Sequence, residues 1–235
     1  MRFAESRSLL ALLLCAGMVG CASVKQPLAD LQQAAQKVVA PAAAASSPAA
    51  PVKAEPDTPV SPAAQRGFDD ARRALAAGRV DEAERGFRAL TQSDPTLAGP
   101  HANLGILYRQ AGKLKESAGE LEKAVQANPQ RAVTFNQLGI TYRQLGQFAK
   151  ARDAYEKAIA LDPGYAAPLL NLGILHDLYL GDGAQAMALY VRYLALQPTG
   201  DATVTKWVAD LKNRKAAAPQ QQQQQQAMLE RKEQP

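Results

Sequence analysis

Apolar and polar positions follow a helical period from Pro62 to about residue 215. Apolar side chains recur three and four positions apart, and glycine or proline follows each run. No segment of this part alternates with the two-residue period of a half-buried strand. The pattern therefore predicts an all-α domain over residues 62–215.

One helical phrase occurs three times in this region. NLGILYRQAG begins at Asn103, QLGITYRQLG at Gln137 and NLGILHDLYLG at Asn171, so the phrases start 34 residues apart. A fixed period of this length is typical of a solenoid of repeated units. Together with the prolines at 95, 129, 163 and 198, it divides the domain into repeats 64–97, 98–131, 132–165 and 166–200.

The third unit carries the most complete pattern. Within residues 132–165 it contains Phe135, Leu138, Gly139, Tyr142, Gly146, Ala151, Tyr155, Ala158 and Pro163. This pattern resembles the tetratricopeptide repeat (TPR). The resemblance implies a short TPR solenoid of about four helix-turn-helix repeats, with a groove along its first helices.

The glycines of the phrase need a physical reason. A glycine in the middle of a helix costs about 1 kcal/mol relative to alanine. We therefore expect Gly139 to let its helix approach Ala151 closely, with Leu138, Tyr142 and Tyr155 packed around the contact. Gly112 and Gly146 should end first helices in the left-handed conformation.

The outer repeats depart from the pattern, as expected where a solenoid has no neighbour to cover it. The first repeat has Asp70 and Ala74 in place of Leu and Tyr, and the fourth has one extra residue, expected to lengthen its turn at 180–183. After Asp201, a favourable N-cap, a helix over 201–215 should cap the solenoid with one apolar face: Val204, Trp207, Val208 and Leu211.

The first 20 residues are typical of a secretory signal, with Arg2 and Arg7 before an apolar run. The following Cys21 and the small residue Gly20 resemble the lipobox of bacterial lipoproteins, which implies an acylated Cys21 that anchors the chain in a membrane. An ordinary signal peptide that ends beside a cysteine is the alternative. By the sorting rule of that family, Ala22 implies the outer membrane, facing the periplasm, rather than the inner membrane.

Two segments flank the predicted domain. Residues 21–61 are rich in Ala and Pro and should form a disordered tether. Residues 216–235 contain seven consecutive glutamines and little apolar mass to bury, so we expect a disordered tail or a frayed helix.

Composition and charge narrow the possible chemistry. The 27 basic and 22 acidic residues are interspersed, which argues against a nucleic-acid surface. The histidines, His101 and His176, occupy packing positions, and no Cys or His pair has zinc spacing. We therefore expect no catalytic residues, metal site, cofactor or small-molecule substrate.

The TPR resemblance implies a concave groove that binds a protein or an extended peptide segment. The implied groove positions are Asn103, Ile106, Arg109, Gln110, Gln137, Ile140, Arg143, Gln144, Asn171 and Ile174. Asn103, Gln137 and Asn171 are similar to the asparagine ladder of O-linked GlcNAc transferases, in which amides hold peptide main chain. The alternative is that these are ordinary helix residues.

Together, these features predict a lipid-anchored TPR scaffold of the bacterial cell envelope. This combination resembles the pilotin lipoproteins of type IV pilus biogenesis and the adaptors of cell-wall enzymes. An accessory subunit of an energised transport or motility complex is the alternative, followed by an enzyme subunit.

Overall fold

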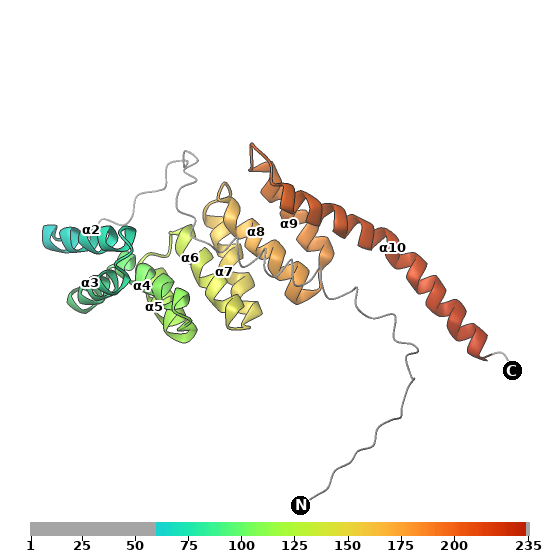
Figure 1. Cartoon of the computed structure of the whole chain (residues 1–235), viewed down its shortest axis with the longest axis horizontal. Coiled ribbons are helices and arrows are strands. Elements are labelled where there is room, and N and C mark those ends of the chain that lie inside the picture. The colour runs from blue at the N-terminus through green and yellow to red at the C-terminus, as the bar shows by residue number, and fades with distance from the viewer. Residues whose placement is uncertain (1–59, 234–235) are drawn as a thin grey trace, which may run out of the picture. The chain divides into compact units, whose positions relative to one another are not determined.

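The computed structural model describes residues 60–233, without the side chains of residues 215, 217–227 and 230–233 (Figure 1). This part of the chain is built from helices and contains no strand, which confirms the all-α prediction. The helices are α2 (Pro62–Ala76), α3 (Val80–Ser93), α4 (Ala98–Gln110), α5 (Leu114–Ala127), α6 (Ala132–Gln144), α7 (Phe148–Leu161), α8 (Ala166–Leu175), α9 (Gly183–Ala195) and α10 (Ala202–Glu233). A π-helical turn, η1 (His176–Leu180), directly continues α8. The predicted signal, lipidated cysteine and nearly all of the tether lie outside the described residues.

The helices form consecutive antiparallel pairs, one for each predicted repeat (Figure 1). Within each pair the two helices pack extensively, and the second helix of one pair packs against the first helix of the next. The first helices also contact one another, α4 with α6 and α6 with α8. The domain is therefore a TPR-like solenoid in which α4, α6 and α8 lie side by side.

The mid-helix glycines make room for large side chains of the second helices. A Cβ atom on Gly139 would lie 2.6 Å from the ring of Tyr155, and one on Gly173 would lie 2.5 Å from the ring of Tyr190. The atoms nearest to Gly139 therefore belong to the ring of Tyr155, which we expected to pack around this contact, rather than to Ala151, four residues earlier on the second helix. Tyr155 is fully buried in this arrangement.

The turns inside the helix pairs share one backbone conformation, a glycine with positive φ. Gly112 and Gly146 have φ angles of 75° and 73°, which confirms the predicted left-handed ends. Gly78 and Gly181 adopt the same conformation.

The extra residue of the fourth repeat is absorbed inside its first helix. Residues 176–180 form a π turn, and only Gly181 and Asp182 separate it from α9. In the third repeat, three residues separate α6 from α7. The expected longer turn was therefore wrong, because a π turn accommodates one additional residue without breaking the helix.

Helix α10 caps the solenoid as predicted. Asp201 accepts hydrogen bonds from the backbone N–H groups of Thr203 and Val204. The four predicted apolar residues are buried, and the ring of Trp207 lies 5.5 Å from that of Tyr190. The helix continues beyond the expected end at 215 to Glu233 and takes in the glutamine run, because Ala, Gln, Glu, Lys and Arg all favour helix.

Candidate functional site

The predicted binding residues all lie on α4, α6 and α8, and we call their shared surface the first-helix face. Because these three helices contact one another, their side chains form one surface that crosses three repeats. The predicted residues differ in exposure: Gln110 and Gln144 are exposed, Asn103, Ile106, Arg109 and Gln137 are half-buried, and Ile140, Arg143, Asn171 and Ile174 are buried.

The three amides of the predicted ladder make different contacts. The Asn103 amide nitrogen donates to the carbonyl oxygen of Gly99, one turn earlier in α4, at 2.9 Å. The Gln137 side-chain oxygen accepts from Nη2 of Arg109 at 2.5 Å, which links α6 to α4. These two amides remain partly accessible, with further hydrogen-bonding groups available.

Asn171 does not share this accessibility. It is 6% exposed, and its amide nitrogen donates to Oδ1 of Asn136 at 3.0 Å. Asn136 in turn donates to the hydroxyl oxygen of Tyr165 at 3.1 Å. The expectation of an exposed ladder position therefore fails at Asn171, because the amide holds α8 against α6.

Sequence reasoning missed Asn136 because it considered only the ladder position that follows it. The residue is 2% exposed and hydrogen-bonds to two neighbouring segments. Its signal in the sequence was the pair of consecutive amides, Asn136 and Gln137, in the middle of an amphipathic helix. A buried amide at such a position requires partners, and neighbouring helices supply them.

Two arginines occupy equivalent positions on α4 and α6. Arg109 is half-buried and Arg143 is 6% exposed, and no Asp or Glu whose side chain the structure describes is paired with either. Both Nε atoms are buried without a hydrogen-bond partner. Burial lowers the pKa of Arg109, and the positive charge of the neighbouring Arg143 lowers it further.

Tyr155 brings a third polar group to these arginines. Its hydroxyl is buried, and no described residue lies in good hydrogen-bonding geometry with it. Burial raises the pKa of Tyr155, while the positive charge of Arg143, a looser polar contact with the Arg143 side chain and the charge of Arg109 oppose that shift. The guanidinium of Arg143 also lies 5.8 Å from the ring centroid of Tyr179, so an aromatic ring packs beside it.

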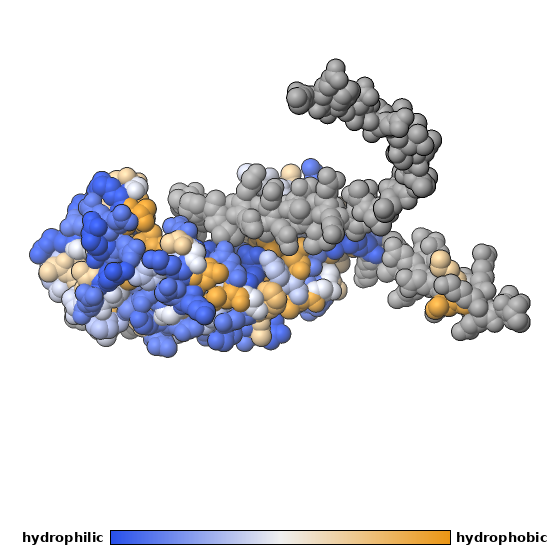
Figure 2. Space-filling model, turned by 60° about the horizontal axis from the view of Figure 1, so that its bottom comes forward, coloured by the Kyte–Doolittle hydropathy of each residue, from blue (hydrophilic) through white to orange (hydrophobic). Residues whose placement is uncertain are grey.

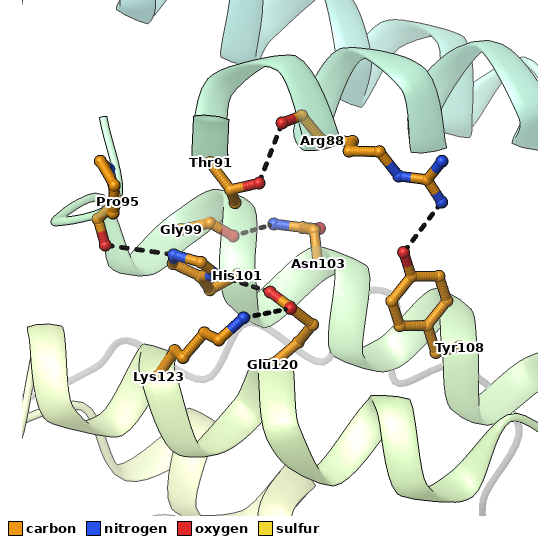
Figure 3. A network of polar contacts seen from close by, with 9 residues as sticks. All are labelled: Arg88, Thr91, Pro95, Gly99, His101, Asn103, Tyr108, Glu120 and Lys123. Carbon is orange, nitrogen blue, oxygen red and sulfur yellow. Dashed lines mark hydrogen bonds and ion pairs between the residues drawn. The ribbon is translucent and has the colours of Figure 1, made fainter. Parts of the chain in front are cut away.

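The histidines serve packing rather than this face. His101 is buried, with Nδ1 2.5 Å from Glu120 Oε2 and Nε2 3.1 Å from the carbonyl oxygen of Pro95 (Figure 3). Lys123 donates to the other oxygen of Glu120 at 2.7 Å. His176 Nδ1 lies 3.8 Å from Asp182, beside the turn between η1 and α9.

Among residues 60–233, no group of three or more His, Cys, Asp and Glu side chains could hold a metal ion. No described helix combines the length and hydrophobicity that a membrane crossing requires. Figure 2 shows a mostly hydrophilic surface on the coloured part of its face, with hydrophobic residues in small separate groups.

Comparisons with known proteins agree on the repeat. Residues 132–165 match the family model of the tetratricopeptide repeat. No significant match is found among curated proteins.

Solved structures share the fold across much of the chain. PilF of Pseudomonas aeruginosa is 23% identical, with a TM-score of 0.58 and coverage of 68% of this chain and 72% of its own. MamA of Desulfovibrio magneticus RS-1, from residue 41 to its end, is 17% identical, with a TM-score of 0.59 and coverage of 74% and 99%. A thermophilic TPR protein of Thermus thermophilus is 25% identical, with a TM-score of 0.52 and coverage of 63% and 80%.

Proposed function

Because the chain is a tetratricopeptide repeat protein, we propose that it is a scaffold of the bacterial cell envelope that binds an extended segment of a partner protein along the first-helix face. TPR domains mediate protein–protein interaction, and the repeats here form such a domain. In this proposal a lipid on Cys21 holds the scaffold at the outer membrane, facing the periplasm. The partner belongs to a pilus, secretion or cell-wall assembly.

The continuity of the first-helix face across repeats is the observation that carries this function. Helix α6 contacts α4 on one side and α8 on the other, so equivalent side chains recur at the spacing of packed helices. That spacing is about 8 to 10 Å, close to the length of three extended residues at ~3.3 Å each. An extended segment that crosses the helices can therefore meet one set of equivalent positions per repeat.

The accessible amides give this face a means to hold main chain. Asn103 uses one N–H group in its bond to Gly99, and Gln137 uses its oxygen in the bond to Arg109. The amide oxygen of Asn103 and the amide nitrogen of Gln137 have no hydrogen-bond partner in the described chain and are able to pair with a peptide. In the proposal Asn103 and Gln137 bind the partner, while Asn171 supports the helix packing beneath it.

The envelope location is supported by the sequence alone. Cys21 follows an apolar run and a small residue, and the Ala- and Pro-rich tether separates it from the first repeat.

Site-specific photo-cross-linking tests the proposed face. A benzoylphenylalanine at exposed Val133, one helical turn before Gln137 on α6, should give a discrete adduct with one partner in the cell envelope. The same probe at exposed Lys157, on the second helix α7, serves as the matched control and should give no such adduct. Equal adducts at both positions, or an adduct only at Lys157, would contradict the proposal.

A further inference from the structure

We propose that Arg109, Arg143 and Tyr155 form a carboxylate-binding site that receives an Asp or Glu side chain of the bound segment. This inference rests on the proposed function and adds to it the chemistry of the partner. The site would make the first-helix face selective for an acidic segment.

The three side chains converge from three helices. Arg109 on α4 donates to the side-chain oxygen of Gln137, so its guanidinium reaches across to α6, the helix that carries Arg143. Tyr155 comes from α7, and its ring packs at the position that a Cβ of Gly139 would occupy, also on α6. Consistent with this convergence, the charges of both arginines affect the pKa of Tyr155.

Three polar atoms of this cluster make no hydrogen bond of good geometry within the described chain. Nε of Arg109, Nε of Arg143 and the hydroxyl of Tyr155 are all buried without a hydrogen bond. A buried charge is costly unless it is paired, and a second like charge nearby adds to that cost. An anion between the two guanidinium groups would pair both charges and accept hydrogen bonds from the unpartnered donors.

The geometry of the donors favours a carboxylate. A guanidinium presents its N–H groups as a planar fork that matches the two oxygens of a carboxylate. The guanidinium of Arg143 packs beside the ring of Tyr179, and that of Arg109 is hydrogen-bonded to Gln137. Both guanidinium groups are therefore positioned before a ligand binds. Since an extended segment crosses this face in the proposed function, an Asp or Glu side chain is the carboxylate that it presents here.

Nuclear magnetic resonance of the arginine Nε–H groups tests the site directly. The purified chain is titrated, in about 0.15 M salt, with an acetylated and amidated hexaglutamate peptide. Amidated hexaglutamine is the neutral control, and hexaglutamine with a free carboxyl terminus distinguishes a terminal carboxylate from a side-chain carboxylate. Hexaglutamate should shift the Nε–H resonances of Arg109 and Arg143 saturably, and neutral hexaglutamine should not.

The results of this titration decide between the sources of the carboxylate. An effect of the free-terminus peptide without an effect of hexaglutamate would assign the site to a chain terminus and overturn the assignment to an Asp or Glu side chain. If neither carboxylate peptide shifts these resonances more than neutral hexaglutamine does, the site is overturned.

Variants separate binding from folding. Arg109→Gln should weaken hexaglutamate binding at least about tenfold, the effect of one lost charge-assisted hydrogen bond. Arg85→Gln removes an exposed positive charge from α3 and should change the affinity less than about twofold. An equal loss of hexaglutamate affinity in both variants would show that only the overall charge of the protein matters, and would overturn the site.

Tyr155→Phe gives a signature that a purely structural role would not produce. The substitution removes a buried hydroxyl that makes no hydrogen bond of good geometry but keeps the ring against Gly139, so the unliganded protein should melt at the same temperature or higher. Hexaglutamate affinity should nevertheless fall by about threefold to tenfold. A lower melting temperature with unchanged affinity would contradict the assignment of Tyr155.

The cross-linking at Val133 keeps this inference separable from the proposed function. If Arg109→Gln leaves the Val133 adduct and the hexaglutamate titration unchanged, the carboxylate site fails while the first-helix face remains the binding surface. If the Val133 adduct itself is absent while Lys157 gives one, the proposed function fails.

Discussion

The side-chain amide of Asn171 donates a hydrogen bond to Oδ1 of Asn136, 3.0 Å away on the first helix of the preceding repeat. Both residues are buried, and Asn136 also bonds to Tyr165. One position of the predicted peptide-binding ladder therefore joins two repeats. Of the three equivalent ladder positions, Asn171 therefore serves packing between repeats, whereas Asn103 and Gln137 remain available for binding.

This division predicts different effects for two equivalent asparagines. Asn171→Ala removes a buried hydrogen bond and leaves Asn136 without one partner, so the free energy of unfolding should fall by about 1 to 3 kcal/mol. Asn103→Ala removes a half-buried amide bonded within its own helix and should change stability by less than about 0.5 kcal/mol. Urea unfolding of both variants provides the measurement, and equal changes would contradict the roles assigned here.

The close contact between Gly139 and Tyr155 predicts that even one added methyl group at position 139 lowers the stability of the protein. Gly139→Ala would place a Cβ 2.6 Å from the Tyr155 ring, so overpacking should destabilise the protein by about 1 to 3 kcal/mol. Gly119 on α5 has open space around it, and Gly119→Ala should instead stabilise the protein by roughly 0.5 to 1 kcal/mol. Thermal melts would show opposite shifts of the midpoint, and shifts of the same sign would rule out this packing.

The contacts of Glu120 with His101 and Lys123 predict that the stability of the fold depends on pH. Burial acts to raise the pKa of Glu120, but its bonds with Lys123 and His101 outweigh burial, and the pKa lies below its ordinary value of 4.5. A lowered pKa in the folded state stabilises the fold above pH 4.5, and this stabilisation is lost as the pH falls through the lowered value. Wild type should therefore exceed Glu120→Gln in stability at pH 6 and lose that advantage on acidification.

Denaturant unfolding between about pH 6 and pH 3 checks this sign, since it covers the ordinary Glu range. Glu116→Gln, at an exposed position of the same helix, provides the control for general charge effects. A wild-type advantage that grows toward low pH would show that the carboxylate does not stabilise the fold through these partners.

The proposed anchor predicts the location of the chain in the cell. Wild type should sediment with the outer-membrane fraction, and Cys21→Ser should release a soluble periplasmic form, because a lipidated residue supplies the membrane affinity. Cys15→Ser is the matched control and should leave the fractionation unchanged. Identical fractionation of wild type and Cys21→Ser would contradict lipid anchoring.

The sequence was sufficient for features that depend on spacing along the chain. The 34-residue interval predicted the helix pairs, and Gly112 and Gly146 at the ends of two phrases predicted left-handed turns. The apolar face that includes Trp207 predicted that the last helix caps the solenoid, since helical periodicity alone determines which side chains share a face.

Features that depend on contacts between helices were harder to predict. Residue spacing allows Gly139 to face either Ala151 or Tyr155, and only the packed structure selects the ring. The extra residue of the fourth repeat could lengthen a turn or widen a helix, and the pattern does not distinguish these outcomes. Likewise, the burial of Asn171 follows from the approach of α8 to α6, which has no signature within one repeat.

The central claim is that the first-helix face binds the partner, and calorimetric titration tests it most directly. The partner segment captured at Val133 would be synthesised and titrated into wild type, into an Asn103→Ala/Gln137→Ala double variant and into Lys157→Ala. Each lost amide should cost ~0.5 to 1.5 kcal/mol, so the double variant should bind roughly fivefold to 150-fold more weakly. The account predicts that loss with Lys157→Ala unchanged, and equal dissociation constants for all three proteins would contradict it.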